Sequence, residues 1–249
     1  MRELTLSLER PGRADFPYYG QVSGRRWLVV VLAVLAALAT FFVVGHFLHG
    51  PFSVFVPTAL FVGIPLAALA YATGGRVSGL FARLTWRDVR AMLGYGVLSI
   101  LATIVAGYVV GPLVGTVPPN PIFDQIADAP PLWLATFYPR TALQLLGEEL
   151  LTVLPFLALL HWLAARRGRT RAIVLAWVVS SVWFGLVHLP AYGWNVPMCV
   201  LVVGAARMAL TWSYIRTKKL WVATGAHIAH DWLLLTPFVI AALYGAGHA

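Results

Sequence analysis

The sequence predicts an all-α fold, a polytopic integral membrane bundle of about seven to eight transmembrane helices. Of its 249 residues, 60% are hydrophobic and 11% are charged, and the mean hydropathy is +0.80. Soluble domains carry about 25% charged residues, so this composition lies outside their range. The apolar residues are also gathered in runs of about 20, the length that an α-helix needs to cross a bilayer.

Seven runs meet this length and account for most of the chain after the first 26 residues. They are 27–49, 52–73, 90–115, 142–164, 171–189, 196–215 and 220–245. The segments between them are less regular. Residues 83–92, with Trp86 and Asp88, fit a surface helix, and 117–131 is a Pro-rich external loop. Residues 131–141 form either an interfacial lead-in to the fourth span or its first turns.

The basic residues predict the orientation of the chain. Sixteen of the 18 Lys and Arg residues lie before the first span or on the loops after the second, fourth and sixth spans. Cytoplasmic loops carry an excess of Lys and Arg, so the N-terminus is expected in the cytoplasm and the C-terminus outside. We find no internal repeat. We therefore expect residues 1–26 to be a cytoplasmic segment and 27–249 to form a single transmembrane domain.

Charge and cysteine content exclude other classes. The net charge of +9 does not indicate nucleic-acid binding, because the basic residues form short clusters between apolar runs instead of one patch. The expected partner is the lipid bilayer. The single cysteine, Cys199, lies in an apolar run, so no intramolecular disulfide can form and a packing role is expected.

Acidic residues inside the spans are the main functional signal. These residues are Glu148, Glu149 and Asp231. An ionised carboxylate at the bilayer centre costs at least ~2.5 kcal/mol, so such positions indicate function. Glu148 lies on a polar stripe of the fourth span with Thr141, Gln144 and Thr152, whereas Glu149 is rotated by about 100° toward apolar residues. Glu148 is therefore the stronger candidate to face a polar chamber, and a hydrogen bond for helix packing is the alternative.

Histidines lie in the neighbouring spans. His188 ends the fifth span one turn after Phe184, and it either contributes an imidazole to a site or packs at the interface. In the seventh span, His227, His230 and Asp231 can face one groove. Two histidines and a carboxylate can bind zinc, or can orient a water through an imidazole whose tautomer the Asp fixes. A purely structural hydrogen-bonded pair is the alternative.

The positions of Arg207, His188 and His227 along their spans lead to two structural expectations. Arg207 lies midway along the sixth span, where an isolated guanidinium is costly, so it is expected to pair with one of the carboxylates. On ideal helices His188 lies near the outer end of its span, while His227 lies only about 12 Å from the cytoplasmic start of its own. The two histidines must nevertheless meet if they share a site.

The motifs, taken together, resemble the CAAX-processing and bacteriocin-processing (CPBP, Rce1-like or Abi) intramembrane proteases. The resemblance covers about residues 131–235 and rests on three motifs in order: Glu148-Glu149, Phe184-x-x-x-His188 and His227-x-x-x-Asp231. It implies an endopeptidase in which Glu148 and His188 activate a water while His227 and Asp231 complete the site. Supporting positions are Glu149, Phe184, His230 and Arg207. Zinc, held by His188 and His227, is left open by the resemblance.

Two positions depart from the family's usual motifs. The first motif is usually Glu-Glu-x-x-x-Arg, but residue 153 here is Val. Arg140 or Arg207 is the candidate to replace this counter-charge. The last motif more often ends in Asn, and Asp231 adds a negative charge that favours a cation.

We therefore expect a peptidase, of metalloprotease or glutamate type, that hydrolyses a membrane-associated peptide or protein tail. The abundance of Ala, Val and Arg with only two Lys suggests a bacterial cell membrane, and with it a peptide precursor or surface protein in place of a prenylated CaaX tail. Two alternatives stay open. Val153 suggests a non-catalytic scaffold or immunity protein of the same family, and ionisable residues in the spans also occur in proton-coupled transporters.

Overall fold

The computed structural model describes residues 9, 15–48, 53, 55–115 and 119–246. Over these ranges the regular structure is entirely helical, and seven helices are long and apolar enough to cross a membrane. The predicted all-α membrane bundle is confirmed, and the chain is an integral membrane protein. Parts of the predicted N-terminal segment, the first interhelical loop and the 117–131 loop lie outside the described residues.

The seven crossings agree with the predicted spans to within a few residues. They are α1 (Gly24–Phe47), α2 (Phe55–Thr73), α3 (Trp86–Val114), α6 (Phe137–Arg167), α7 (Arg169–Val187), a sixth that joins the π-helical segment η3 (Met198–Val203) to α8 (Gly204–Thr217), and α9 (Leu220–Ala246). The shorter elements are η1 (Ser78–Leu80), α4 (Ile122–Ala127), α5 (Pro131–Ala135) and η2 (Leu189–Tyr192).

The interhelical segments differ from the prediction in two places. No separate surface helix forms over residues 83–92, because Thr85 and Asp88 form a capping box that starts α3 at Trp86. The Pro-rich segment 117–131 contains α4 and the first residue of α5 in place of an irregular loop. Pro131 occupies the first helical position of α5, where its missing N–H costs nothing. Residues 131–141 accordingly supply both a short lead-in helix and the first turns of α6.

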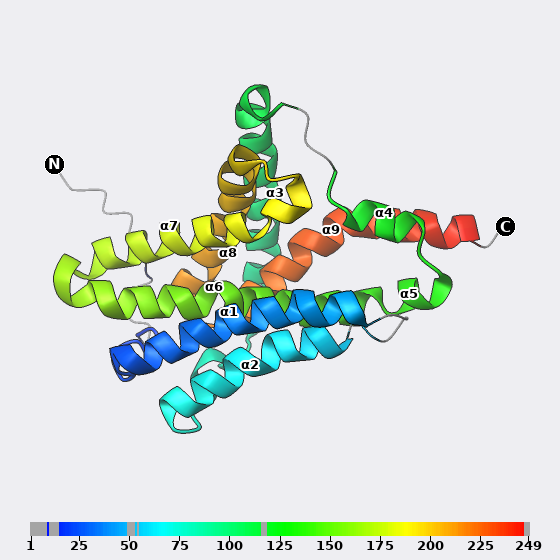
Figure 1. Ribbon diagram of the computed structural model, residues 1–249. Helices are drawn as coiled ribbons and strands as arrows, with labels where there is room; N and C mark the ends of the chain where they lie inside the picture. The colour runs from blue at the N-terminus through cyan, green and yellow to red at the C-terminus, as the bar shows by residue number, and fades with distance from the viewer. Residues whose placement is uncertain (1–8, 10–14, 49–52, 54, 116–118, 247–249) are drawn as a thin grey trace.

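The bundle has two differently oriented parts. Figure 1 shows α1, α2, α6 and α7 side by side, while α3 crosses their direction steeply. Helices α8 and α9 contact α3 as well as α7 and α6, so they connect the two parts. Close approach of α3 to α9 depends on glycine: a Cβ on Gly96 would lie 2.9 Å from the Ala226 carbonyl oxygen. The polar site lies where α6, α7, α8 and α9 meet.

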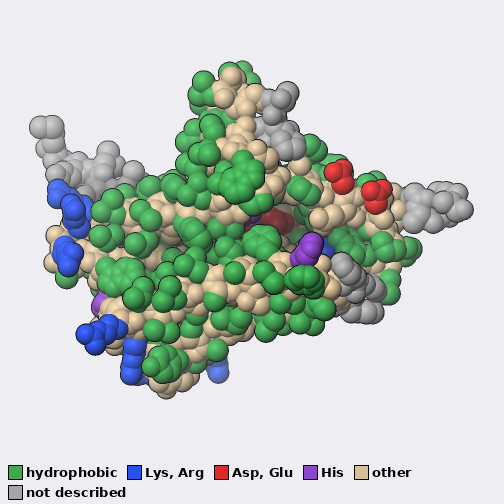
Figure 2. Space-filling view, viewed as in Figure 1, with side chains coloured by type: hydrophobic (Ala, Val, Ile, Leu, Met, Phe, Trp, Pro, Cys, Tyr) green, Lys and Arg blue, Asp and Glu red, His purple; other side chains and the backbone are tan. Residues whose placement is uncertain are grey.

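Charged side chains are separated along the bundle. Figure 2 shows Lys and Arg gathered at the end where α1 begins and α6 meets α7, and Asp and Glu at the opposite end near α4. This distribution follows from the alternation of basic loops along the sequence. The cytoplasmic location of the basic end stays a prediction, as does the division at residue 26.

The segment before α1 is attached to the basic end by an ion cluster that we call the N-terminal clasp: Glu9, Asp15, Phe16, Arg169 and Lys218. Glu9 forms ion pairs with Arg169, at 2.7 Å, and with Lys218. Asp15 pairs with Arg169 at 2.6 Å, and the Lys218 ammonium lies 3.2 Å from the centre of the buried Phe16 ring. The clasp joins the start of the chain to the α6–α7 turn and the α8–α9 turn.

Candidate active site

The two adjacent glutamates of α6 lie in different environments. Glu149 is fully buried, whereas the Glu148 side chain keeps 15% of its surface exposed. Glu148 accepts a hydrogen bond from Gln144 Nε2 at 3.0 Å, one turn earlier on the polar stripe. The expected difference between the two glutamates is thus present, with Glu148 on the accessible side of the helix.

Arg207 is the counter-charge of Glu149. Its Nη2 lies 2.7 Å from Glu149 Oε1 and 2.9 Å from Oε2, and both side chains are fully buried. Val153, where the family motif usually has Arg, is buried in the apolar core. A guanidinium from α8 therefore occupies the role that an arginine one turn after Glu149 would have, and the predicted pairing of Arg207 with a carboxylate is confirmed.

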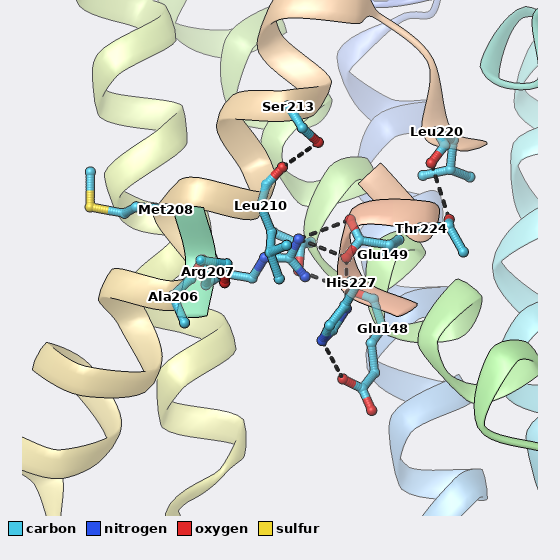
Figure 3. Close-up of polar contacts among 12 residues, drawn as sticks. Glu148, Glu149, Ala206, Arg207, Met208, Leu210, Ser213, Leu220, Thr224 and His227 are labelled. Atoms are coloured by element: carbon cyan, nitrogen blue, oxygen red, sulfur yellow. Dashed lines mark hydrogen bonds and ion pairs between the residues drawn. The ribbon is translucent and has the colours of Figure 1, made fainter. Parts of the chain in front are cut away.

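His227 of α9 lies between the two glutamates (Figure 3). Its Nδ1 lies 2.8 Å from Glu149 Oε1, and because a carboxylate only accepts, Nδ1 carries the proton and donates. Nε2 faces the other way, 3.8 Å from Glu148 Oε2. Glu149 thus fixes the imidazole tautomer, a role that the sequence had suggested for Asp231.

Asp231 completes the cluster from one turn further along α9. Its Oδ1 lies 3.8 Å from His227 Nε2, and its side chain is 29% exposed. Figure 2 shows acidic side-chain atoms at the bottom of a hollow in an otherwise apolar face. Both distances of 3.8 Å exceed a direct hydrogen bond and fit contact through one water.

His188 reaches the same depth through the geometry of the α6–α7 hairpin. Gly168, whose φ of 73° favours glycine, forms the tight turn between the two antiparallel helices. Glu148 lies twenty residues before this turn and His188 twenty residues after it. Helix α6 extends far beyond the end of α7, so the last residue of the short fifth span is level with the middle of the long fourth one.

Phe184 links His188 to the cluster. The His188 ring packs against it at a tilt of 43°, with the ring centres 4.6 Å apart. The centre of the Phe184 ring also lies 6.0 Å from that of His227 and 4.8 Å from the Arg207 guanidinium carbon. His188 Nδ1 donates to the Phe184 carbonyl oxygen at 2.8 Å. Within the described chain His188 forms no hydrogen bond or ion pair with Glu148, His227 or Asp231, so its connection to them runs through Phe184.

His230 and Arg140 do not join the cluster, in contrast to the roles that the sequence suggested for them. His230 Nδ1 is buried without a hydrogen-bond partner, and its backbone faces Gly96 of α3. Arg140 forms no ion pair with any described carboxylate, so the role of counter-charge falls to Arg207 alone. A three-residue offset on α9 rotates His230 about 60° from His227, which is enough to direct it toward α3.

The structure adds one polar residue near the site that the sequence did not single out. Tyr192 of η2 lies close enough for the Asp231 charge to act on it. Burial raises the pKa of the Tyr192 phenol, and the Asp231 charge adds to the rise. The phenol accepts a hydrogen bond from Asn120 Nδ2 at 3.2 Å and keeps its own proton to donate. Its position in a non-transmembrane turn left no periodic signal in the sequence.

The donor atoms do not form a zinc site as they stand. Structural and catalytic zinc ions take three or four His, Cys, Asp or Glu ligands. Across the described ranges no group of three such side chains is placed to hold a metal ion. Nδ1 of both His188 and His227 is used as a donor, which leaves only Nε2 of each ring as a possible metal ligand. We therefore derive no step through a metal, and zinc binding by these histidines stays a prediction.

The site can hold and polarise a water molecule. When His227 is neutral, its Nε2 is an acceptor, and it faces two carboxylates that are also acceptors. A water that donates one hydrogen to Nε2 and the other to Glu148 satisfies these groups. Such a water has a carboxylate base beside it, which is the arrangement that general-base hydrolysis requires.

Comparison with known proteins finds one similar family. Residues 130–233 match the family described as "Type II CAAX prenyl endopeptidase Rce1-like". No curated protein and no solved structure matched the chain. The matched segment runs from the residue before α5 into α9, so it contains Glu148, His188, His227 and Asp231. The segment that forms the site, residues 130–233, is thus similar to the Rce1-like family, the resemblance that the order of its motifs predicted.

Proposed function

We propose that this protein is an intramembrane endopeptidase that hydrolyses a membrane-associated peptide or protein tail with a water activated by Glu148 and His227. The observation that carries the proposal is the placement of the accessible Glu148 carboxylate 3.8 Å from the Nε2 of His227, whose Nδ1 is held by the buried Glu149. The Rce1-like match of residues 130–233 supports the same reaction class.

The proposed reaction uses Glu148 as base and then as acid. His227 Nε2 orients the water, Glu148 takes one of its protons, and the water oxygen attacks the scissile carbonyl carbon. The protonated Glu148 then gives this proton to the leaving amine nitrogen as the C–N bond breaks. His188 in its doubly protonated form is the proposed donor to the oxyanion. Glu149 and Arg207 position His227 and do not contact the substrate.

We also propose that the protein lies in a bacterial cell membrane with its basic end in the cytoplasm. The separation of Lys and Arg from Asp and Glu along the bundle supports this orientation.

Peptide cleavage by the purified protein tests the proposal. The full chain, reconstituted in liposomes, is incubated with a peptide library, and new termini are identified by mass spectrometry. We expect cleavage that Glu148→Gln abolishes. The matched control is Asp124→Asn, which removes a carboxylate from the exposed face of α4, far from the site, and should retain activity.

The same preparation distinguishes the alternatives. If neither the natural protein nor the Asp124→Asn variant cleaves any peptide, the result would favour a non-catalytic scaffold. Uptake of solutes into the liposomes that depends on a pH gradient and is lost in Glu148→Gln would favour a transporter.

A further inference from the structure

Arg140 is a buried cation that has no anionic partner among the residues that the structure describes. It lies in the first turn of α6 and is only 6% exposed. Its guanidinium stacks on the Trp133 ring, 3.7 Å from the ring centre, and lies 5.7 Å from that of Phe137. Nε and Nη2 are buried and have no hydrogen-bond partner. The contact with Trp133 supplies no hydrogen-bond acceptor for Nε and Nη2.

The surroundings add nothing that compensates this charge. No carboxylate among the described residues lies within ion-pair distance of Arg140, since those of the membrane spans are engaged with Arg207 and His227. The first turn of a helix is also the positive end of its dipole, which disfavours a cation there. A buried, unpaired cation is costly, and an oxyanion in the guanidinium plane would remove the cost.

The position of Arg140 relates it to the candidate active site. Arg140, Gln144 and Glu148 are successive members of one i, i+4 row of α6, and Gln144 already donates to Glu148. Eight residues of helix place Arg140 about 12 Å from Glu148 along the axis. An extended peptide covers this distance in roughly three to four residues, at about 3.3 Å each.

We propose that Arg140 binds a carboxylate of the substrate peptide, three to four residues from the scissile bond. This inference rests on the proposed function, because it places the peptide along α6 with its reacting carbonyl at Glu148. The carboxylate is that of the C-terminus or of an Asp or Glu side chain. The enclosure of Arg140 by protein, with Trp133 against one face, favours a narrow peptide end over the bulkier phosphate of a lipid headgroup.

Peptide binding to an inactive variant tests this assignment without requiring cleavage. The full chain carrying Glu148→Gln is placed in phosphatidylcholine nanodiscs. It is titrated with three pools of fluorescein-labelled, randomised octapeptides: one with a free C-terminal carboxylate, one amidated, and one amidated with Asp at the last position. We expect the carboxylate pool to bind at least about tenfold more tightly than the amidated pool, the effect of a charge-assisted hydrogen bond.

Arg140→Met and Arg140→Lys are the matched variants. Methionine keeps an apolar stem against Trp133 and should weaken only the carboxylate pool, whereas lysine should retain part of the preference. Tight binding of the Asp pool would extend the assignment to side-chain carboxylates. Because Arg140→Met removes an unpaired buried charge, the melting temperature of this variant without peptide should not fall below that of the protein with Arg140.

Three results would overturn the assignment. The first is equal binding of the carboxylate and amidated pools. The second is a preference for the carboxylate pool that persists in Arg140→Met. The third is an Arg140→Met variant that binds the amidated pool less tightly and also melts at a lower temperature. Loss of the preference when phosphatidylglycerol replaces phosphatidylcholine in the nanodiscs, with unchanged binding of the amidated pool, would identify a lipid phosphate as the ligand instead. A binding preference without cleavage by the natural protein would refute the proposed function alone, and cleavage without a preference would refute only the role of Arg140.

Discussion

At the scale of single residues, the site depends on two adjacent glutamates that face in different directions. Glu149 is enclosed with Arg207 and holds His227, while Glu148 is accessible and faces the other nitrogen of the same ring. A rotation of about 100° between neighbours on a helix is enough to separate a buried structural charge from a reactive one.

This separation predicts that two similar substitutions change the free energy of unfolding by very different amounts. Glu149→Gln leaves the fully buried Arg207 without its charge partner, and such losses cost about 3–5 kcal/mol. Glu148→Gln keeps an acceptor for Gln144 and should change the free energy of unfolding by less than about 1 kcal/mol. Chemical unfolding of both variants in detergent measures the difference. Equal losses, or no rescue of Glu149→Gln by Arg207→Met, would contradict the assigned roles.

At the scale of elements, the α6–α7 hairpin and the π-helical segment set the position of His188. A Cβ on Gly185, three residues before His188, would lie 2.2 Å from the Cys199 carbonyl oxygen of η3. Only glycine allows α7 to approach η3 this closely. The end of α7 is therefore held by backbone contact as well as by the Phe184 ring.

Gly185→Ala should consequently destabilise the protein by about 1–3 kcal/mol, as overpacked cores do, and displace His188. Gly204→Ala is the matched control, because its Cβ would meet that same carbonyl oxygen at an ordinary 3.8 Å. Thermal unfolding and peptide cleavage of the two variants provide the comparison. A tolerated Gly185→Ala would show that the contact does not position His188.

The N-terminal clasp gives the fold a dependence on pH at acid values. Burial alone would raise the pKa of Glu9, but hydrogen bonds from Arg169 and Lys218 outweigh it and lower the pKa below 4.5. The pKa of Asp15 is lowered below 3.8 in the same way, by Arg169 against the effect of burial. Both groups therefore contribute stability that is fully present above these ordinary values and is lost as the pH falls from them through the lower pKa values of the folded protein.

The melting temperature of the natural protein should accordingly exceed that of Glu9→Gln at about pH 6, with a difference that shrinks toward about pH 3. Melting curves of both proteins across this range measure the effect. A difference in melting temperature that does not change with pH would mean that the folded protein does not stabilise the ionised form of Glu9. Lys218 changes stability in the same direction at higher pH, since burial lowers its pKa to about 8 and the cost of burying its charge is relieved as the pH rises above that value.

At the scale of the whole molecule, hydropathy and the positions of charged residues were sufficient to predict the bundle. The seven spans, the accessible Glu148 and the pairing of Arg207 could all be predicted, because each follows from local periodicity or from the cost of burying a charge. Three features could not be predicted: the depth of His188 in the bundle, the contact of Glu149 with His227, and the direction of His230 toward α3. They depend on how far α6 extends beyond α7 and on the packing of α3 against α9, which are tertiary properties.

The predicted orientation can be tested by labelling. The only native cysteine, Cys199, is buried, so single cysteines can be introduced at the exposed positions Ser78, at the basic end, and Asp128, after α4. In intact cells a membrane-impermeant maleimide should label the Asp128→Cys protein and not the Ser78→Cys protein. The reverse pattern would invert the topology.

The central claim is that Glu148 activates a water for peptide hydrolysis, and cleavage in ¹⁸O-enriched water tests it most directly. The natural protein should produce a new C-terminus that contains one ¹⁸O atom, and Glu148→Gln, with an unchanged melting temperature, should lower the rate by about 10²–10⁴-fold. A folded Glu148→Gln variant that cleaves at the natural rate, or a product without the label, would contradict the account.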